Sequence, residues 1–160
     1  MKLSQLISAD QILPEMRAED HWPAIVELVD HLRDAGQLDA SLYEEVLSAL
    51  KVREELVSTG IGSGVAIPHA FSDHVDRVIA VLGRSQEGID FEALDGAPVH
   101  FVFLFIVPRK DYHLHLRTLA AIAKMFTNSE IRRLIAAADS REEILAILDP
   151  KSSRVAAPGN

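Results

Sequence analysis

His69 follows a short apolar run and a proline, in a stretch that also carries three closely spaced glycines. Residues 53–70 read REELVSTGIGSGVAIPHA. Proline has a fixed φ and no amide donor, so we expect the apolar run 65–67 to form a strand that ends at Pro68. His69 would then leave the strand at the rim of a sheet, near backbone amides that the glycine loop can supply. An imidazole in that place can act as a nucleophile toward a phosphoryl group.

The glycines Gly60, Gly62 and Gly64 match neither of the common nucleotide-binding loops. GIGSG leads into an apolar strand, whereas the dinucleotide fingerprint leads into the first turn of a helix. A Walker loop would continue with Gly-Lys-Ser or Gly-Lys-Thr, which is absent here. Nucleotide binding is therefore not expected. An ordinary surface histidine after a glycine turn remains the alternative for His69.

Phosphoryl transfer to an imidazole needs hydrogen-bond donors and positive charge around the phosphoryl oxygens. Arg53 can offer the planar N–H fork of a guanidinium. The alternative for Arg53 is structural, because it falls near the C-terminal end of a predicted helix. There the helix dipole stabilises an exposed cation by ~0.3–1 kcal/mol.

His115 is the second histidine that could serve the same phosphoryl group, by donating an imidazole N–H. It shares a helix face with Leu119, so a hydrogen-bonded histidine at the edge of the core is the alternative. His113 shares a face with Arg117 and is expected in solvent. A spacing of two on a helix points the rings of His113 and His115 apart, so we expect no metal site there.

Composition limits the compartment and the partners. The chain has 160 residues, 48% of them apolar and 25% charged, which is typical of one soluble domain with a real core. Its formal net charge of −8 argues against nucleic acid or an anionic membrane as a partner. Cysteine is absent, which excludes disulfides and thiolate sites. No convincing signal peptide and no membrane span can be recognised, so we expect a cytoplasmic protein without membrane insertion.

One helix is predicted to start near Asp39 or Ser41, where Ser41 and Glu44 have the pattern of a capping box. Four further helices are predicted from apolar spacing and caps. These four cover residues 21–35, 113–126, 129–138 and 141–148, with the third capped by residues 127–129 and the last by Ser140.

Strands are expected over residues 77–82 and 99–107 besides 65–67. Residues 71–76 read as a polar loop and 83–88 as a turn. The run 99–107 is apolar on both faces and so belongs in the middle of a covered sheet. We predict a single α/β domain with a mixed central β-sheet and helices on both faces, over residues 1–148. Residues 149–160 are predicted to be a disordered tail.

Beyond these local patterns, STGIGSGVAIPHA resembles the active-site signature of a known family. This family comprises the enzyme IIA domains of the fructose/mannitol class, type 2, in the phosphoenolpyruvate-dependent sugar phosphotransferase system. The version in this chain is most similar to the nitrogen-regulatory branch. Three further matches extend the resemblance over about residues 1–148: Arg53-Glu54, Asp95-Gly96-Ala97-Pro98-Val99, and His115-Leu116 followed by Leu119.

The resemblance implies a role for each matching residue. His69 would be the phosphoryl acceptor, His115 its supporting partner and Arg53 the cation that stabilises the phosphoryl group. The phosphoryl-binding loop would contain Ser58, Thr59, Gly60, Gly62 and Gly64. The family also implies an early strand near residues 11–13 and no cofactor or metal. The donor would be a histidine phosphocarrier protein, HPr-like or NPr-like.

Three functions stay open. The favoured one is a regulatory phosphocarrier of the nitrogen type, which acts through regulatory target proteins, and Thr59-Gly60-Ile61 supports it. The second is a IIA subunit of a sugar transporter that passes phosphate to a IIB domain. The third is a binding module that has lost phosphoryl transfer, which the presence of Arg53, His69 and His115 disfavours. Ala70 departs from the glycine of many relatives and is expected to narrow the approach to His69.

Overall fold

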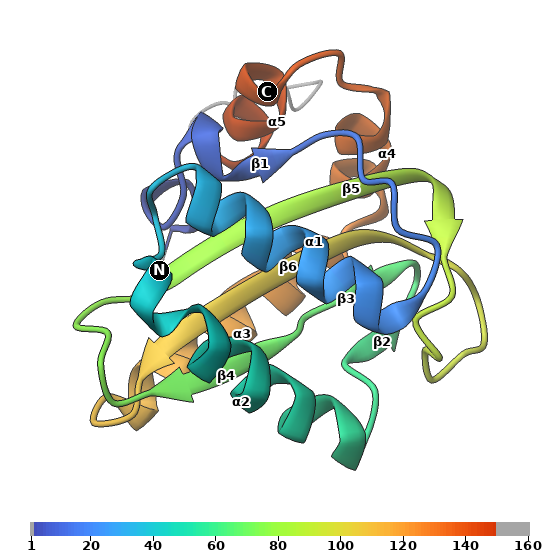
Figure 1. Cartoon of the computed structure of the whole chain (residues 1–160). Helices are drawn as coiled ribbons and strands as arrows, with labels where there is room; N and C mark the ends of the chain where they lie inside the picture. Colours follow the sequence, from blue (N-terminus) through green and yellow to red (C-terminus); the bar gives the residue numbers. More distant parts are fainter. Residues whose placement is uncertain (1, 150–160) are drawn as a thin grey trace.

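The structure is a computed structural model that describes residues 2–149 (Figure 1). A mixed sheet runs through its centre in the order β1-β5-β6-β3-β2, and β4 pairs with β6 beyond β3. The strands are β1 (Ile12–Leu13), β2 (Gly60–Gly62), β3 (Val65–Ala66), β4 (His69–Ser72), β5 (Ile79–Ile89) and β6 (Val99–Pro108). The helices are α1 (His21–Asp34), α2 (Tyr43–Leu56), α3 (Tyr112–Phe126), α4 (Ser129–Ala137) and α5 (Arg141–Leu148), with short 3-10 turns at Leu3–Gln5, Ala9–Gln11 and Ala40–Leu42.

Strand β6 is the centre of the sheet, as its apolar sequence predicts. It pairs antiparallel with β5 on one side and parallel with β3 and β4 on the other. Its side chains alternate between two separate cores. Phe101, Phe103 and Phe105 enter one core, whereas Val102, Leu104 and Ile106 enter the other.

Helices cover both faces of the sheet, which confirms the predicted fold class. Helices α1 and α2 lie on the near face in Figure 1, and their buried residues share a core with Val102 and Leu104. Helices α3, α4 and α5 supply apolar side chains to the core on the opposite face, which contains Phe103 and Phe105. The single α/β domain with a mixed sheet is therefore confirmed.

Helix starts follow the predicted caps with one exception. The Asn128 side chain accepts hydrogen bonds from the first turn of α4, and Ser140 accepts one from the Glu143 amide at 3.1 Å. The exception precedes α2, where Asp39 caps the 3-10 turn Ala40–Leu42. The Ser41 hydroxyl donates to Asp39 across 2.8 Å, so the predicted Ser41–Glu44 capping box is replaced by an Asp39 cap.

The turn predicted over residues 83–88 is wrong, because β5 continues through it to Ile89. Gly83 serves close packing here, since an added Cβ would lie only 2.3 Å from the sulfur of Met16. The positive φ of 95° falls at Gly88. That glycine lies within the irregular stretch of pairing between Arg84 and Ile89.

The strand exit predicted at His69 is also wrong, and the loop predicted over residues 71–76 begins only after Ser72. Strand β3 does end before the proline, but β4 resumes pairing with β6 at His69. Pro68 has no amide hydrogen to donate to the sheet, but its carbonyl oxygen still accepts a hydrogen bond from the Phe105 amide at 3.1 Å. The chain therefore stays paired with β6 on both sides of the proline. His69 is thus the first residue of a strand, and residues 69–72 are not a loop.

Within residues 2–149, no helix combines the length and the apolar character needed to cross a bilayer. The predicted tail, 149–160, lies outside the described residues except for Asp149.

Candidate active site

The strand register sets the position of His69. His69 lies opposite Phe105 in the parallel pair of β4 and β6, and its ring stacks on the Phe105 ring with centroids 5.2 Å apart. Its Nδ1 lies 2.7 Å from the Ile67 carbonyl oxygen. A carbonyl can only accept, so Nδ1 carries the proton and Nε2 holds the free lone pair. Nε2 makes no hydrogen bond within residues 2–149. It is not fully shielded from solvent, so a partner can reach it.

His115 reaches the same place from the first turn of α3. The centroids of the His69 and His115 rings are 5.0 Å apart, inside the limit of about 7 Å expected for two rings that share one phosphoryl group. Both ring nitrogens of His115 are shielded from solvent and have no hydrogen-bond partner within residues 2–149. A buried donor without a hydrogen-bond partner costs free energy. An acceptor bound beside the His115 ring would remove that cost.

Aromatic side chains complete the surroundings of His115. Its ring lies 4.9 Å from that of Phe71 and 5.7 Å from that of Tyr112, centroid to centroid. Phe71 comes from β4, two residues after His69 and therefore on the same face of the sheet. The loop predicted over residues 71–76 gives Phe71 no role here, which is wrong, because Phe71 belongs to β4. Continuing the strand past Pro68 would have found it by the alternation of faces.

Burial and charge lower the pKa of both histidines below the ordinary value of 6.5. For His69 the main cause is burial, which the hydrogen bond to Ile67 partly opposes, and the charges of Arg53 and His115 lower the pKa further. For His115 the causes are burial and then the Arg53 charge. Both imidazoles are therefore neutral at pH 7, the form in which one can be a nucleophile and the other an N–H donor.

Arg53 lies in the last turn of α2, and its charge acts on both histidines. Its Nη1 donates to the Val57 carbonyl across 2.9 Å, which satisfies an orphan carbonyl beyond the helix end. The capping role considered for Arg53 is thus present. It does not exclude a role at the phosphoryl group, because the fork has further N–H donors.

Glu54 is a functional candidate for which the sequence patterns predict no role of its own. It is buried, and its carboxylate accepts hydrogen bonds from the Thr59 amide at 3.1 Å and from the Thr59 hydroxyl. The same carboxylate accepts from Nε2 of His21 at 2.6 Å, and so links α1 to the end of α2. A carboxylate near a helix C-terminus opposes the helix dipole. That unfavourable position is the signal that could have pointed to Glu54.

The predicted phosphoryl-binding loop is a hairpin whose tip points away from His69. Its near end is Ser58 and Thr59, and the Thr59 carbonyl accepts from the Ile67 amide at 3.0 Å. The Ser58 hydroxyl accepts from the Gly60 amide at 3.1 Å and donates to the Phe91 carbonyl at 2.7 Å. The amides of Thr59 and Gly60 are therefore already occupied within the fold.

Gly62 and Gly64 lie at the far end of that hairpin. The Gly64 carbonyl accepts from the amides of His100 and Phe101, four or more residues along β6 from Phe105. At ~3.3 Å per residue this is about 13 Å from the level of His69. The expectation that Gly62 and Gly64 lie beside His69 is therefore wrong, because β2 runs antiparallel to β3 and leads away from the histidine.

Two further expectations about access to His69 need correction. The side chain is more buried than a rim position suggests, with 7% of its surface exposed. Ala70 does not narrow the approach, because consecutive strand residues face opposite sides. Its methyl group packs in the core beneath α1 and α2.

His113 and His74 make no contact with His69 or His115. His113 is exposed, and His74 lies near Glu45 with its Nδ1 2.8 Å from a carboxylate oxygen. Across residues 2–149, no group of three or more histidine, aspartate or glutamate side chains is arranged to hold a metal ion.

Comparison with known proteins decides the family. The model of the family "Phosphoenolpyruvate-dependent sugar phosphotransferase system, EIIA 2" matches residues 5–151. The chain belongs to this family. Members of the EIIA 2 family are components of a phosphotransferase system, and the recognised motif lies within the matched range.

The relatives of this EIIA chain bear two kinds of name. It is 31% identical over 149 residues to a "Nitrogen regulatory protein" of Bradyrhizobium diazoefficiens, covering 92% of this chain and 95% of the relative. It is 35% identical over 150 residues to the "PTS system fructose-specific EIIABC component" of Bacillus subtilis, covering 93% of this chain and 23% of the relative. The solved structure of nitrogen regulatory protein IIA-Ntr from Neisseria meningitidis shares 31% identity and a TM-score of 0.82, over 91% of this chain and 98% of the other.

Proposed function

We propose that this EIIA chain is a regulatory phosphocarrier whose His69 Nε2 accepts a phosphoryl group from a phosphohistidine donor protein. The lone pair of Nε2 forms the new P–N bond while the P–N bond to the donor's imidazole breaks. The donor nitrogen leaves with the electron pair of that bond. The proton on Nδ1 stays in its hydrogen bond to Ile67, so the acceptor ring needs no proton transfer during the step.

The observation that carries this proposal is the His115 ring beside His69, whose two nitrogens are shielded from solvent and have no hydrogen-bond partner within residues 2–149. A phosphoryl group on Nε2 of His69 would bring oxygen acceptors to the side of a ring that lacks one. The N–H of His115 can then donate to an oxygen that gains negative charge in the transition state. Arg53, whose charge already acts on both rings, supplies the positive charge that the loose transition state requires.

Exposed apolar side chains around this site support a protein as the donor. Val52 and Leu56 are spaced by four on α2, which carries Arg53. Tyr112 and Leu116 are spaced by four on α3, which carries His115. Residues four apart share a helix face, and exposed apolar faces mark sites of protein contact. We therefore infer a docking surface for a histidine phosphocarrier protein, HPr-like or NPr-like.

Regulation of the nitrogen type is the role that we favour. Its support is likeness over nearly the whole length of two proteins named nitrogen regulatory, at 31% identity each. A sugar-transport role is the second candidate, because the identity to the fructose-specific EIIABC component is 35%. In that role His69 would pass its phosphoryl group to a IIB domain. The cytoplasmic location stays a prediction.

The experiment that tests the proposal combines phosphoenolpyruvate, the general phosphotransferase enzyme and a histidine phosphocarrier protein with the purified chain. Acid-labile phosphate is then located by mass mapping at alkaline pH. Wild type and His74→Gln should be labelled to the same level, since His74 is exposed and pairs with Glu45 instead of with His69 or His115. His69→Ala should carry no acid-labile phosphate. Equal labelling of His69→Ala would contradict the assignment, and absence of label in a folded wild type would favour the binding-module alternative.

A further inference from the structure

Three aromatic rings surround the pair of histidines at the candidate active site. Phe105 stacks on His69, while Phe71 and Tyr112 lie against His115 at centroid distances of 4.9 and 5.7 Å. Phe71 and Tyr112 also stack on each other, with centroids 6.1 Å apart and ring planes 8° from parallel. The chain has six phenylalanines, two tyrosines and one tryptophan, so a third of its large rings gather at this one place.

These three rings differ in exposure to solvent. Phe105 is fully buried and Phe71 is partly buried, whereas 57% of the surface of Tyr112 is exposed. Tyr112 is therefore the outermost ring of the group. Its hydroxyl makes no hydrogen bond within residues 2–149, so stacking on Phe71 holds the ring in place.

The His115 ring gives evidence of a cover over this site. The residue as a whole is only partly buried, yet both ring nitrogens are shielded from solvent and have no hydrogen-bond partner within residues 2–149. Polar atoms near a protein surface normally bind water when no protein group is available. Because Tyr112 is the exposed one among the aromatic neighbours of His115, its ring is placed to keep water from these nitrogens.

A phosphoryl group on His69 would need such a cover. With the proton kept on Nδ1, phosphorylation of Nε2 gives a positively charged ring, which is a good leaving group. Water can then attack: its oxygen forms a P–O bond, the P–N bond breaks, Nε2 takes back the electron pair and a proton from the water passes to solvent. The product is inorganic phosphate. Excluding water from a reactive intermediate suppresses this side reaction.

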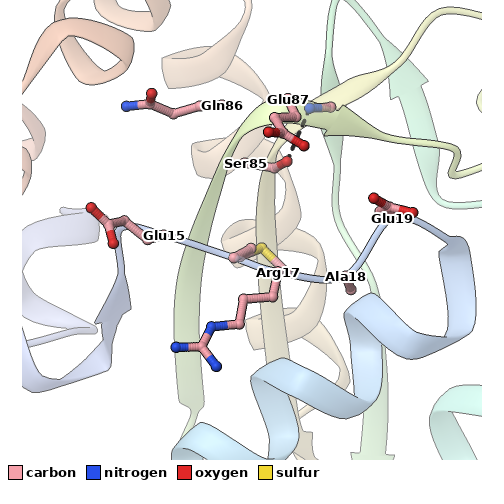
Figure 2. Close-up of a pocket in the computed structure, with 9 residues that line it drawn as sticks. Glu15, Arg17, Ala18, Glu19, Ser85, Gln86 and Glu87 are labelled. Atoms are coloured by element: carbon pink, nitrogen blue, oxygen red, sulfur yellow. Dashed lines mark hydrogen bonds between the residues drawn. The ribbon is translucent and has the colours of Figure 1, made fainter.

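A hollow of about 360 Å³ at one end of β5 shows a contrasting lining (Figure 2). The carboxylates of Glu15, Glu19 and Glu87 lie around it together with Arg17, and no aromatic side chain among residues 2–149 lines it. Charged groups of this kind hold water strongly. Aromatic cover is thus not common to every hollow of this surface.

We propose that Tyr112 is a positioning residue that shields the phosphorylated state of His69. Its ring, stacked on Phe71, keeps water from the side of the phosphoryl group that faces His115. The His115 N–H is then left to donate to a phosphoryl oxygen and not to water. This role rests on the proposed function of His69, and it lets the phosphoryl group persist after the donor protein has left.

The first test needs no phosphoryl transfer. Burial is the main cause of the low pKa of His115, and the charge of Arg53 lowers this pKa further. Tyr112→Ala leaves Arg53 and His69 in place and removes the cover, so the pKa of His115 should rise toward 6.5 in an NMR titration of the ¹⁵N-histidine-labelled chain. Tyr112→Phe keeps the ring and should titrate like wild type. An unchanged His115 pKa in folded Tyr112→Ala would overturn the shielding role.

The second test follows the loss of the phosphoryl group. The chain is labelled through phosphoenolpyruvate and the phosphocarrier protein, the donor proteins are removed, and the half-life of the label on His69 is measured at a fixed, mildly alkaline pH. Tyr112→Ala should shorten this half-life several-fold, and Tyr112→Phe should restore the wild-type value. Leu94→Ala is the matched control, because it removes an apolar side chain that is likewise exposed, at 72%, and should leave the half-life unchanged.

The outcomes separate this role from the function on which it rests. Absence of label in every variant, wild type included, would contradict the phosphocarrier role, and the His115 titration would still decide whether Tyr112 is a cover. Full labelling with equal half-lives in wild type and Tyr112→Ala would overturn the shielding role and leave phosphoryl transfer standing. Slower uptake in Tyr112→Ala with an unchanged half-life would show that Tyr112 serves donor docking alone.

Discussion

Nδ1 of His69 donates a hydrogen bond across 2.7 Å to the carbonyl oxygen of Ile67, two residues earlier in the chain. This bond determines which nitrogen can react. The proton is held on Nδ1, and the lone pair of Nε2 is left for a phosphorus atom. Only Pro68 lies between the Ile67 carbonyl and His69, the first residue of β4, so the bond closes within three residues of chain. One backbone acceptor therefore sets both the tautomer and the direction of the ring.

Arg53→Lys should slow phosphoryl acceptance ~10-fold or more, although the positive charge is kept, because an ammonium cannot present paired N–H donors. The free energy of unfolding should change by less than about 1 kcal/mol, since only the exposed contact with Val57 is altered. The measurement is the rate of phosphate uptake at equal folded fraction. A rate equal to that of wild type would show that Arg53 only caps the end of α2 and does not stabilise the phosphoryl group.

His115→Phe should separate stability from function. Phenylalanine fills a similar space among Phe71, Phe105 and Tyr112. It also removes two solvent-shielded nitrogens that find no hydrogen-bond partner in the described part of the chain. Replacing an unsatisfied polar group by an apolar one of similar shape is neutral or stabilising, by up to ~1 kcal/mol. Phosphoryl acceptance should nevertheless fall ~10-fold or more, because the N–H donor is lost.

Denaturant unfolding and phosphorylation kinetics of this variant provide the two measurements. A loss of stability above about 1 kcal/mol with unchanged kinetics would show that His115 is a core histidine and not a supporting group. His113→Gln, at an exposed position on the same turn of α3, is the matched control and should change neither quantity.

Glu54→Ala should lower the free energy of unfolding by ~2–4 kcal/mol, because it leaves the buried Thr59 hydroxyl, the Thr59 amide and the His21 ring without their acceptor. Glu55→Ala, at the exposed next position, should cost less than about 0.5 kcal/mol. Urea unfolding of the two variants gives the comparison. Equal small effects would mean that Glu54 does not hold the start of the hairpin.

The pKa values of His69 and His115 predict the direction in which stability depends on pH. Both pKa values in the folded state lie below 6.5, mainly through burial, so the folded chain binds fewer protons than the unfolded chain in that range. Their contribution is complete above the unfolded value and is lost as pH falls through the folded values. Wild type should therefore lose more stability between pH 7.5 and pH 5, about the span of a histidine titration, than His69→Gln does. Parallel pH profiles of the two proteins would contradict the inferred burial of a neutral His69.

The sequence allows the central strand and the helices to be predicted because their patterns are local. The alternation of Phe101, Val102, Phe103 and Leu104 requires two covered faces, and the structure has them. Side-chain caps at Asn128 and Ser140 are local as well. Gly83 misleads because a glycine that allows close packing against Met16 cannot be told from a turn glycine without its distant neighbour.

The site is predictable only in part, for a similar reason. Nothing local brings His69 and His115 together, and their convergence was expected only from the family motif. Pro68 suggests the end of a strand, whereas the strand continues because β6 supplies a partner on its far side. The unpaired nitrogens of His115 and the network of Glu54 depend on packing between distant segments, so no spacing rule reveals them.

The position of the phosphoryl group on the imidazole tests the role of His69 most directly. The chain is labelled with ¹⁵N-histidine and phosphorylated through phosphoenolpyruvate and the phosphocarrier chain, and the ring nitrogens are observed by two-dimensional NMR. We predict one phosphorylated ring, that of His69, with phosphorus bonded to Nε2 and the proton kept on Nδ1. Phosphorus on Nδ1 of His69, or on the ring of any other histidine, would contradict it.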